Sequence, residues 1–240
     1  MIIAALRSVI TYVAVSLYVL IVGPIGMLLA LLFGWKAHLY VLGHVGVRLG
    51  LTLSGIRYRL APAETLLLDR AAVYCANHQS NVDPPLLFYV LHPRMHIFYK
   101  AEINAIPVLA RAFRMGGFIP VDRHNKEAAM RSIDAGAASI RSGNSFLIFP
   151  EGTRSRTDEL LPFKKGGFIM AIKAQAPIVP VAIQGGRAAM HRGSRIIRPA
   201  TFSVRVGEPI ETTGLGLTDR AMLIEKVRAR ITEMLAEGPL

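Results

Sequence analysis

The residues best suited to chemistry in this sequence are His78 and Asp83, five positions apart in the stretch 77–84. A neutral histidine acts as a base when one ring nitrogen is held as a donor and the other is free, and a carboxylate can hold the donor side. Because no nearby serine or cysteine is an evident nucleophile, we infer that the hydroxyl to be activated belongs to a substrate. The alternative is a loop histidine bonded to backbone, with Asp83 acting only as a helix cap.

The neighbouring elements would place this pair at the end of a strand. The apolar run 71–76 predicts a short buried strand. Asp83-Pro84 is typical of a helix start, with Asp83 at the N-cap and Pro84 at the first helical position. His78 would then lie on the connecting loop, at the carboxyl end of a strand, where open α/β sheets usually bind ligands. From the cap, the carboxylate can turn back to the imidazole.

A second polar loop, 149–155, follows another apolar run and reads Phe-Pro-Glu-Gly-Thr-Arg-Ser. Gly152 lets the backbone approach a ligand, and Arg154 offers a forked donor that matches a phosphate. Glu151 can either order the loop or bind a polar group of a substrate. The alternative for this stretch alone is a turn with an exposed ion pair.

Further basic residues follow other predicted strands. Lys100 ends one strand, and Arg123 follows the next as a second candidate phosphate ligand, although Asp122 beside it permits a plain surface salt bridge. Lys164 and Lys165 add charge where a helix begins, and helix N-terminal amides favour anions. Strand ends carrying Arg, Lys and His converge in one doubly wound sheet, so we expect one shared site.

Composition indicates an anionic, apolar environment. The 240 residues contain 28 Lys and Arg against 16 Asp and Glu, a formal charge of +12, and residues 1–60 and 160–207 contain no acidic residue. Such a charge distribution suits phosphates, anionic lipid or nucleic acid, and the hydrophobic share of 52% favours a membrane surface. The single cysteine, Cys75, excludes an internal disulfide and fits a reducing compartment, where it serves as a small strand hydrophobe.

The N-terminal part is predicted to associate with a membrane. Residues 8–35 carry no charge and are long enough to cross a bilayer, but Pro24 predicts either a kinked span or two shorter pieces. Residues 37–55 resemble an interfacial helix; the alternative is a buried hairpin of a soluble protein. Because the basic residues lie mainly after the apolar run, the following domain should be cytoplasmic.

From residue 56 onward, strand-like runs alternate with helical patterns, which predicts an α/β domain with a mostly parallel central sheet flanked by helices. We therefore divide the chain into a hydrophobic two-helix segment (1–55) and an α/β domain (56–240). Pro180 lies within a predicted strand and suggests an edge position or a wall beside an acyl chain. The predicted strands are Ile56–Leu60, Ala71–Ala76, His96–Tyr99, Phe118–Val121, Ser145–Phe149, Ile178–Ile183 and Thr201–Val206. The predicted helices are Pro84–Leu91, Ile106–Met115, Lys126–Ser142, Phe163–Gln175 and Thr218–Ala236, and the longest predicted loops are Ala61–Arg70 and Gly185–Pro199.

Four motifs in order resemble those of the glycerolipid acyltransferases, and most closely the bacterial lysophosphatidic acid acyltransferases. They are Asn-His-Gln-Ser-Asn-Val-Asp (77–83), Lys-Ala-Glu (100–102) with 116–123, the loop 149–155, and Val-Pro-Val (179–181). The resemblance covers about residues 56–210, and the N-terminal hairpin fits the bacterial members. Four motifs in the same order are specific, whereas any one alone would be weak.

The resemblance implies transfer of an acyl group from acyl-CoA or acyl-carrier protein to the sn-2 hydroxyl of lysophosphatidic acid. His78 would be the general base, oriented by Asp83. The acceptor would be bound by Arg123, Glu151, Gly152, Thr153 and Arg154, with Lys100 as an additional helper. The spacing of His78 and Asp83 and the scattered positions of the other histidines predict no metal site. We expect no cofactor beyond the acyl donor, and membrane phospholipids as partners at the cytoplasmic face of the inner membrane.

Three alternatives stay open from the sequence. The acceptor can be another hydroxyl compound, such as glycerol-3-phosphate or a lyso-aminolipid. The chain can also be a non-catalytic basic module that docks on membranes. A nucleic-acid binder is the third alternative, which the long charge-free run disfavours.

Overall fold

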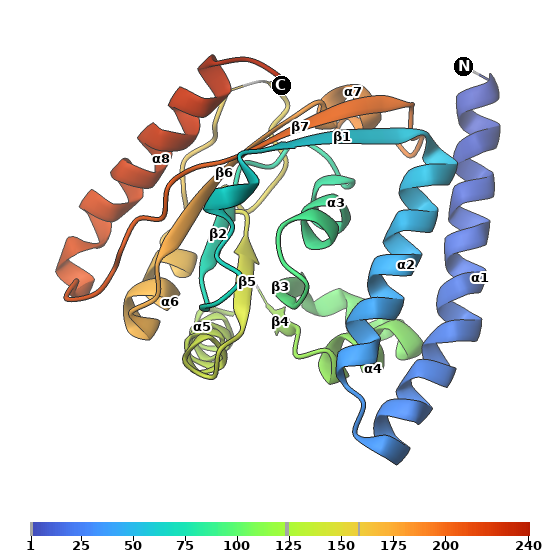
Figure 1. The fold of residues 1–240 in the computed structure, drawn as a ribbon, viewed down its shortest axis with the longest axis horizontal. Coiled ribbons are helices and arrows are strands. Elements are labelled where there is room, and N and C mark those ends of the chain that lie inside the picture. Colours follow the sequence, from blue (N-terminus) through green and yellow to red (C-terminus); the bar gives the residue numbers. More distant parts are fainter. Residues whose placement is uncertain (1, 123–124, 158) are drawn as a thin grey trace.

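The centre of the structure, a computed structural model describing residues 2–122, 125–157 and 159–240, is a seven-stranded sheet (Figure 1). Its order is β1-β7-β6-β2-β5-β3-β4. Among the described residues, every neighbouring pair is parallel except β6 with β7. The seven predicted strands are confirmed to within two residues at each end. They are β1 (Ile56–Ala61), β2 (Val73–Ala76), β3 (Met95–Lys100), β4 (Ile119–Val121), β5 (Ser145–Ile148), β6 (Ile178–Gln184) and β7 (Ala200–Val206).

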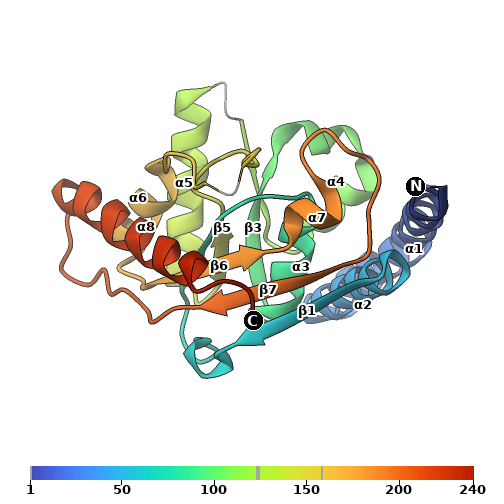
Figure 2. The same cartoon turned by 90° about the horizontal axis from the view of Figure 1, so that it is seen from above.

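The helices cover both faces of this sheet. They are α1 (Ile2–Phe33), α2 (Ala37–Ser54), α3 (Asp83–Val90), α4 (Pro107–Met115), α5 (Lys126–Arg141), α6 (Gly166–Ala174), α7 (Gly186–Met190) and α8 (Arg220–Ala236). Figure 2 shows α5, α6 and α8 on one side, and α3, α2 and α1 on the other. All predicted helices are present, and α7 is an additional short helix within the predicted loop 185–199.

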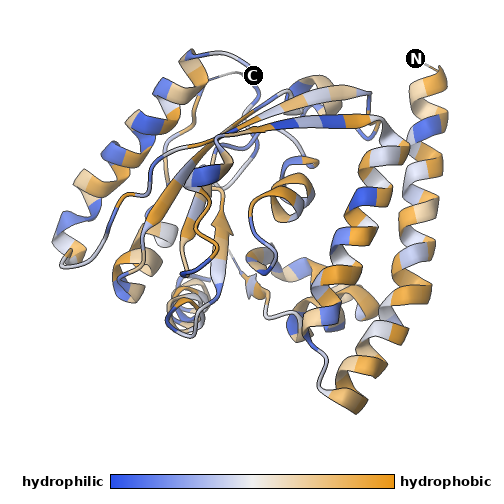
Figure 3. Ribbon diagram, viewed as in Figure 1, coloured by the Kyte–Doolittle hydropathy of each residue, from blue (hydrophilic) through white to orange (hydrophobic). Residues whose placement is uncertain are grey.

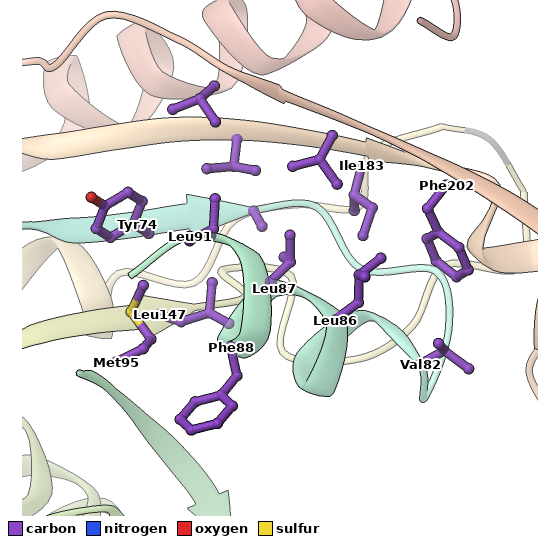
Figure 4. Close-up of a cluster of buried hydrophobic side chains, with 14 of the residues drawn as sticks. Tyr74, Val82, Leu86, Leu87, Phe88, Leu91, Met95, Leu147, Ile183 and Phe202 are labelled. Carbon is purple, nitrogen blue, oxygen red and sulfur yellow. The ribbon is translucent and has the colours of Figure 1, made fainter. Parts of the chain in front are cut away.

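Strand β2 lies in the middle of the sheet and is buried on both faces. Tyr74 and Ala76 belong to the core on the α3 side, whereas Val73 and Cys75 belong to the core beneath α5, α6 and α8. This alternation follows from the two-residue period of a strand and explains the uninterrupted apolar run in the sequence. Figure 4 shows the α3-side core, where leucines of α3 pack toward the sheet.

The prediction that Pro180 lies at a sheet edge is wrong, because β6 pairs with β2 on one side and β7 on the other. Proline is tolerated there because the β7 ladder ends at the pair Val181–Val206, and the next contact is the isolated bridge Ile178–Ile210. The missing N–H therefore faces a gap in the pairing. The carbonyl of Pro180 still accepts a hydrogen bond from the Gly207 amide at 2.8 Å.

Helices α1 and α2 form a hairpin whose outer surface is apolar. Helix α1 is a single helix that includes Pro24, so of the two alternatives predicted for this run the structure excludes two shorter pieces. It is long and apolar enough to cross a membrane, and only 17% of its most apolar window is buried, which excludes the buried-hairpin alternative. Figure 3 shows α1 hydrophobic along most of its length. This exposed apolar helix indicates membrane association.

The two helices pack closely against each other, and α1 also contacts the α/β domain. Gly46 in α2 leaves room for the Tyr18 ring of α1, whose hydroxyl donates to the Leu42 carbonyl at 2.8 Å. The other end of α1 contacts the segment 191–199, which we call the strap. The Ser8 hydroxyl accepts from the amide of Ile197 in the strap at 2.8 Å, and a tyrosine one turn later donates to another strap carbonyl.

Candidate active site

The predicted contact between His78 and Asp83 is present in the structure. His78 follows β2, and its Nδ1 lies 2.9 Å from Oδ2 of Asp83, the first residue of α3. The Asp83 side chain is fully buried, whereas the imidazole is 15% exposed. A carboxylate on Nδ1 selects the tautomer with the proton on that nitrogen and leaves Nε2 as the free acceptor.

The predicted capping role of Asp83 is wrong. Helix α3 begins at Asp83 itself, and the preceding Val82 provides no side-chain cap. Instead, Oδ2 of Asp83 accepts hydrogen bonds from the amides of Gln79 and Ser80, both at 2.7 Å, in the loop before the helix. One carboxylate oxygen thus holds both the loop and the imidazole, which excludes the capping-only alternative.

The other oxygen of Asp83, Oδ1, is buried without a hydrogen-bond partner in the described structure, and it packs against α7. A Cβ atom on Gly186, in α7, would lie 2.6 Å from this oxygen. A larger residue at position 186 would therefore clash with this oxygen and require Asp83 or α7 to move. Gly186 is a positioning residue that the sequence did not reveal.

Glu151 joins the second polar loop to the first. Its Oε1 accepts from the His78 amide at 2.7 Å, and its Oε2 accepts from the Leu161 amide at 2.9 Å. The Ser155 amide in turn donates to the His78 carbonyl at 2.8 Å. Loop 149–155 therefore holds both backbone polar groups of His78.

Of the two roles predicted for Glu151, these contacts match loop ordering. The residue is 3% exposed, and both carboxylate oxygens already accept backbone amides. Burial raises the pKa of Glu151, and the amides of Leu161 and His78 oppose that rise. A carboxylate in this position restricts the motion of the His78 backbone and so of its imidazole.

The remaining predicted ligands border one cavity of about 1430 Å³. Lys100, Gly152, Thr153 and Arg154 all line it together with His78, and Arg123 lies outside the described residues. The parallel order β2-β5-β3 explains this convergence, because the carboxyl ends of the strands meet at one edge. The described members of the predicted set therefore border the same cavity, and their role as ligands stays a prediction.

The interior of the cavity is apolar and is built largely from helices. Helices α1, α2, α3 and α4 supply nearly half of its lining residues, including Gly43, Gly46 and Gly50 of α2. The sequence analysis did not predict this wall, although glycines spaced three and four apart on one helix face were a visible signal. The Val-Pro-Val stretch of β6 does not line the cavity, so it is not the wall of an acyl-binding channel.

Two further residues support the site without having been singled out. Asn77 is buried, and its side chain exchanges two hydrogen bonds with the backbone of Ile183, at 2.9 and 2.7 Å, which ties the end of β2 to β6. Arg192 of the strap lines the cavity and donates to the carbonyl of Arg154 at 3.3 Å. Within the described ranges, no three His, Cys, Asp or Glu residues gather closely enough to hold a metal ion.

Comparison with known proteins gives consistent results. A family model described as Acyltransferase matches residues 57–184. The chain is 31% identical over 219 residues to 1-acyl-sn-glycerol-3-phosphate acyltransferase of Cocos nucifera, covering 88% of this chain and 70% of that protein. It is 33% identical over 172 residues to the human 1-acyl-sn-glycerol-3-phosphate acyltransferase beta, covering 71% and 62%.

Among solved structures, the crystal structure of the 1-acyl-sn-glycerophosphate acyltransferase PlsC from Thermotoga maritima superposes with a TM-score of 0.85. The match covers 99% of this chain and 97% of the other at 22% identity, which shows a shared fold, including the N-terminal hairpin. The family model and the relatives identify the family of this chain, whereas the structural match alone identifies only its fold. This chain belongs to the acyltransferase family.

Proposed function

We propose that this protein transfers a fatty acyl group from a thioester donor to the sn-2 hydroxyl of lysophosphatidic acid, giving phosphatidic acid. The observation that carries the proposal is the His78–Asp83 pair at a cavity that is apolar inside and basic at its polar end. The names of the relatives found above describe the same acceptor.

The geometry supports general base catalysis by His78. Nε2 removes the proton of the acceptor hydroxyl as its oxygen attacks the thioester carbonyl carbon. The resulting imidazolium, stabilised by Asp83, returns that proton to the departing thiolate, so the reaction yields an ester and a free thiol. A positioned base of this kind contributes about 10²–10⁴-fold to the rate.

The polar end of the cavity suits a phosphate. Arg154 supplies a planar fork of donors, and its Nη1 is buried without a hydrogen-bond partner in the described structure. The first turn of α6 adds backbone amides, because Gly166 and Gly167 also line the cavity. A phosphate that occupies this end would place a nearby glycerol hydroxyl within reach of His78.

The apolar interior suits a fatty acyl chain. Each methylene group removed from water contributes about 0.8 kcal/mol to binding, so a long chain gains most of its affinity there. Helices α1 and α2 form part of this wall and also carry the exposed apolar surface. The chain would thus pass from a bilayer to the cavity with little exposure to water.

We place the protein at the inner membrane with the α/β domain on the cytoplasmic side. The basic residues Lys36, Arg48, Arg57 and Arg59 follow α1, and positive residues favour the cytoplasmic side of a membrane. That side also contains the soluble thioesters, acyl-CoA and acyl-carrier protein, that the reaction requires.

The test is an acyl-transfer assay of the purified protein in detergent micelles. The acceptors are lysophosphatidic acid, glycerol-3-phosphate and a lyso-aminolipid, each with palmitoyl-CoA and palmitoyl-acyl-carrier protein. We expect phosphatidic acid from lysophosphatidic acid, and none from the His78→Ala variant. Preferred acylation of another acceptor would refute the substrate assignment, and an active His78→Ala variant would refute the mechanism.

A further inference from the structure

The side chain of Lys164 packs against loop 149–155, which carries Arg154. The mechanism proposed above gives this lysine no role. Its amide donates to the Pro150 carbonyl at 2.7 Å, which fixes the lysine backbone beside loop 149–155. A Cβ atom on Gly152 would come within 2.8 Å of both Nζ and Cε of Lys164. Because Gly152, where φ is +68°, has no side chain, the Lys164 ammonium can pack directly against the backbone of the loop.

The surroundings of this ammonium are built for an anion. Lys164 lines the cavity with Arg154 and Arg192, and the described cavity wall contains no Asp or Glu. No residue in the described ranges forms an ion pair with Lys164. The unpartnered Nη1 of Arg154 is an independent sign that a ligand oxygen belongs here, because buried donors are normally hydrogen-bonded.

Phosphate esters differ in the number of oxygens that Arg154 and Lys164 can bind. A phosphomonoester has three non-bridging oxygens and carries nearly two negative charges at neutral pH, whereas a phosphodiester has two such oxygens and one charge. The guanidinium fork of Arg154 can engage two oxygens at once. A third oxygen needs a separate donor, and an ammonium with three rotatable N–H groups provides one.

We propose that Lys164 binds the third non-bridging oxygen of the acceptor phosphate and makes this enzyme selective for phosphomonoester lysolipids over phosphodiesters. The inference rests on the proposed function and deepens it. Lys165 lines the same cavity but occupies the N-cap position of α6, and the contact with Gly152 belongs to Lys164. Lys164 is therefore the specificity-determining residue of the two.

The experiment measures inhibition of lysophosphatidic acid acylation by two amphiphiles, hexadecyl phosphate (a monoester) and hexadecyl methyl phosphate (a diester). For Lys164→Met, we expect the inhibition constant of the monoester to rise about tenfold or more, as expected for loss of a hydrogen bond to a charged group. The inhibition constant of the diester should stay close to its wild-type value. KM for lysophosphatidic acid should rise with the monoester constant, while kcat changes little.

Two more variants make the result specific. Gly152→Ala should shift the same ratio of inhibition constants, because the added methyl group displaces the ammonium. Lys226→Met removes an exposed lysine of α8 and serves as the matched control, with both constants unchanged. Thermal melts of all three variants separate binding effects from unfolding.

Two outcomes would overturn the role of Lys164. In the first, Lys164→Met weakens both amphiphiles equally, which would mean that the lysine only adds general positive potential. In the second, neither constant changes. Both differ from failure of the proposed function, in which the wild-type protein itself would not acylate lysophosphatidic acid.

Discussion

The contacts of Glu151 allow a sharp test of whether this carboxylate positions His78 or binds the acceptor. In Glu151→Gln the side chain keeps its shape, but one of its two ends becomes an NH₂ group that cannot accept a hydrogen bond. Either the His78 amide or the Leu161 amide then loses its acceptor in a buried place. Hydrogen bonds to charged groups contribute about 1.5–3 kcal/mol, so the loss is substantial.

The neutral amide also regains some free energy. Because burial raises the pKa of Glu151, the carboxylate is costly to keep ionised, and replacing it offsets part of the lost hydrogen bonding. We therefore expect the free energy of unfolding to fall by about 1–2 kcal/mol, which corresponds to a Tm lower by about 2–8 °C for a chain of this size. Differential scanning calorimetry measures this shift.

The kinetic consequence separates the two roles. If Glu151 positions His78 through its backbone, kcat should fall about 100-fold, as small misplacements of catalytic groups do, while KM for the acceptor stays near the wild-type value. The exposed Glu159→Gln, in the same region, is the control and should match wild type in both constants and in Tm. An increased acceptor KM with unchanged kcat and Tm would refute the positioning role and make Glu151 a substrate ligand.

Three further predictions concern other parts of the molecule. Asp83→Asn should fold but lose about 10⁴-fold in kcat, because the imidazole loses its tautomer control and its charge partner; a near-normal kcat would contradict the role of the pair. Burial lowers the pKa of His96 to about 4 in the folded protein. As the pH falls from 6.5 to 4, the unfolded chain therefore binds a proton at His96 more readily than the folded chain does. The free energy of unfolding should fall by about 3 kcal/mol over this range. The variant His96→Gln should lose this part of the pH dependence in denaturant titrations. Deleting residues 1–35 should release the protein from sedimenting vesicles, and continued sedimentation would place the anchor elsewhere.

Much of the fold was predictable because its signals are local. The strands are apolar runs bounded by turn residues. Strand β2 is an example: it is buried on both faces, so each of its positions favours an apolar side chain. Helix α7 was not predicted, because a five-residue helix that begins with Gly186 has too few residues for a periodic pattern. Pro180 misled the sheet assignment, because the gap in the β6–β7 pairing depends on residues beyond the end of β7.

The site was predictable in its membership but less so in its geometry. The pairing of Asp83 with His78 was predicted correctly. The prediction that Asp83 accepts amides of the helix was wrong, because it accepts amides of the preceding loop, and both arrangements share one sequence pattern. The role of Glu151 depends on contacts between residues 73 positions apart. The apolar wall contributed by α1 and α2 likewise arises from tertiary packing, which no local pattern reports.

The bonds between α1 and the strap set an order of events during synthesis. Ser8 and Tyr12 receive their partners at Ile197 and Arg195 only after the ribosome has added 189 and 183 more residues. Until then the nascent α1 can pack against α2 and α4, which are synthesised earlier, but it lacks its contacts with the strap. The cavity wall is therefore completed only when the strap, the last cavity-lining segment to be synthesised, reaches α1.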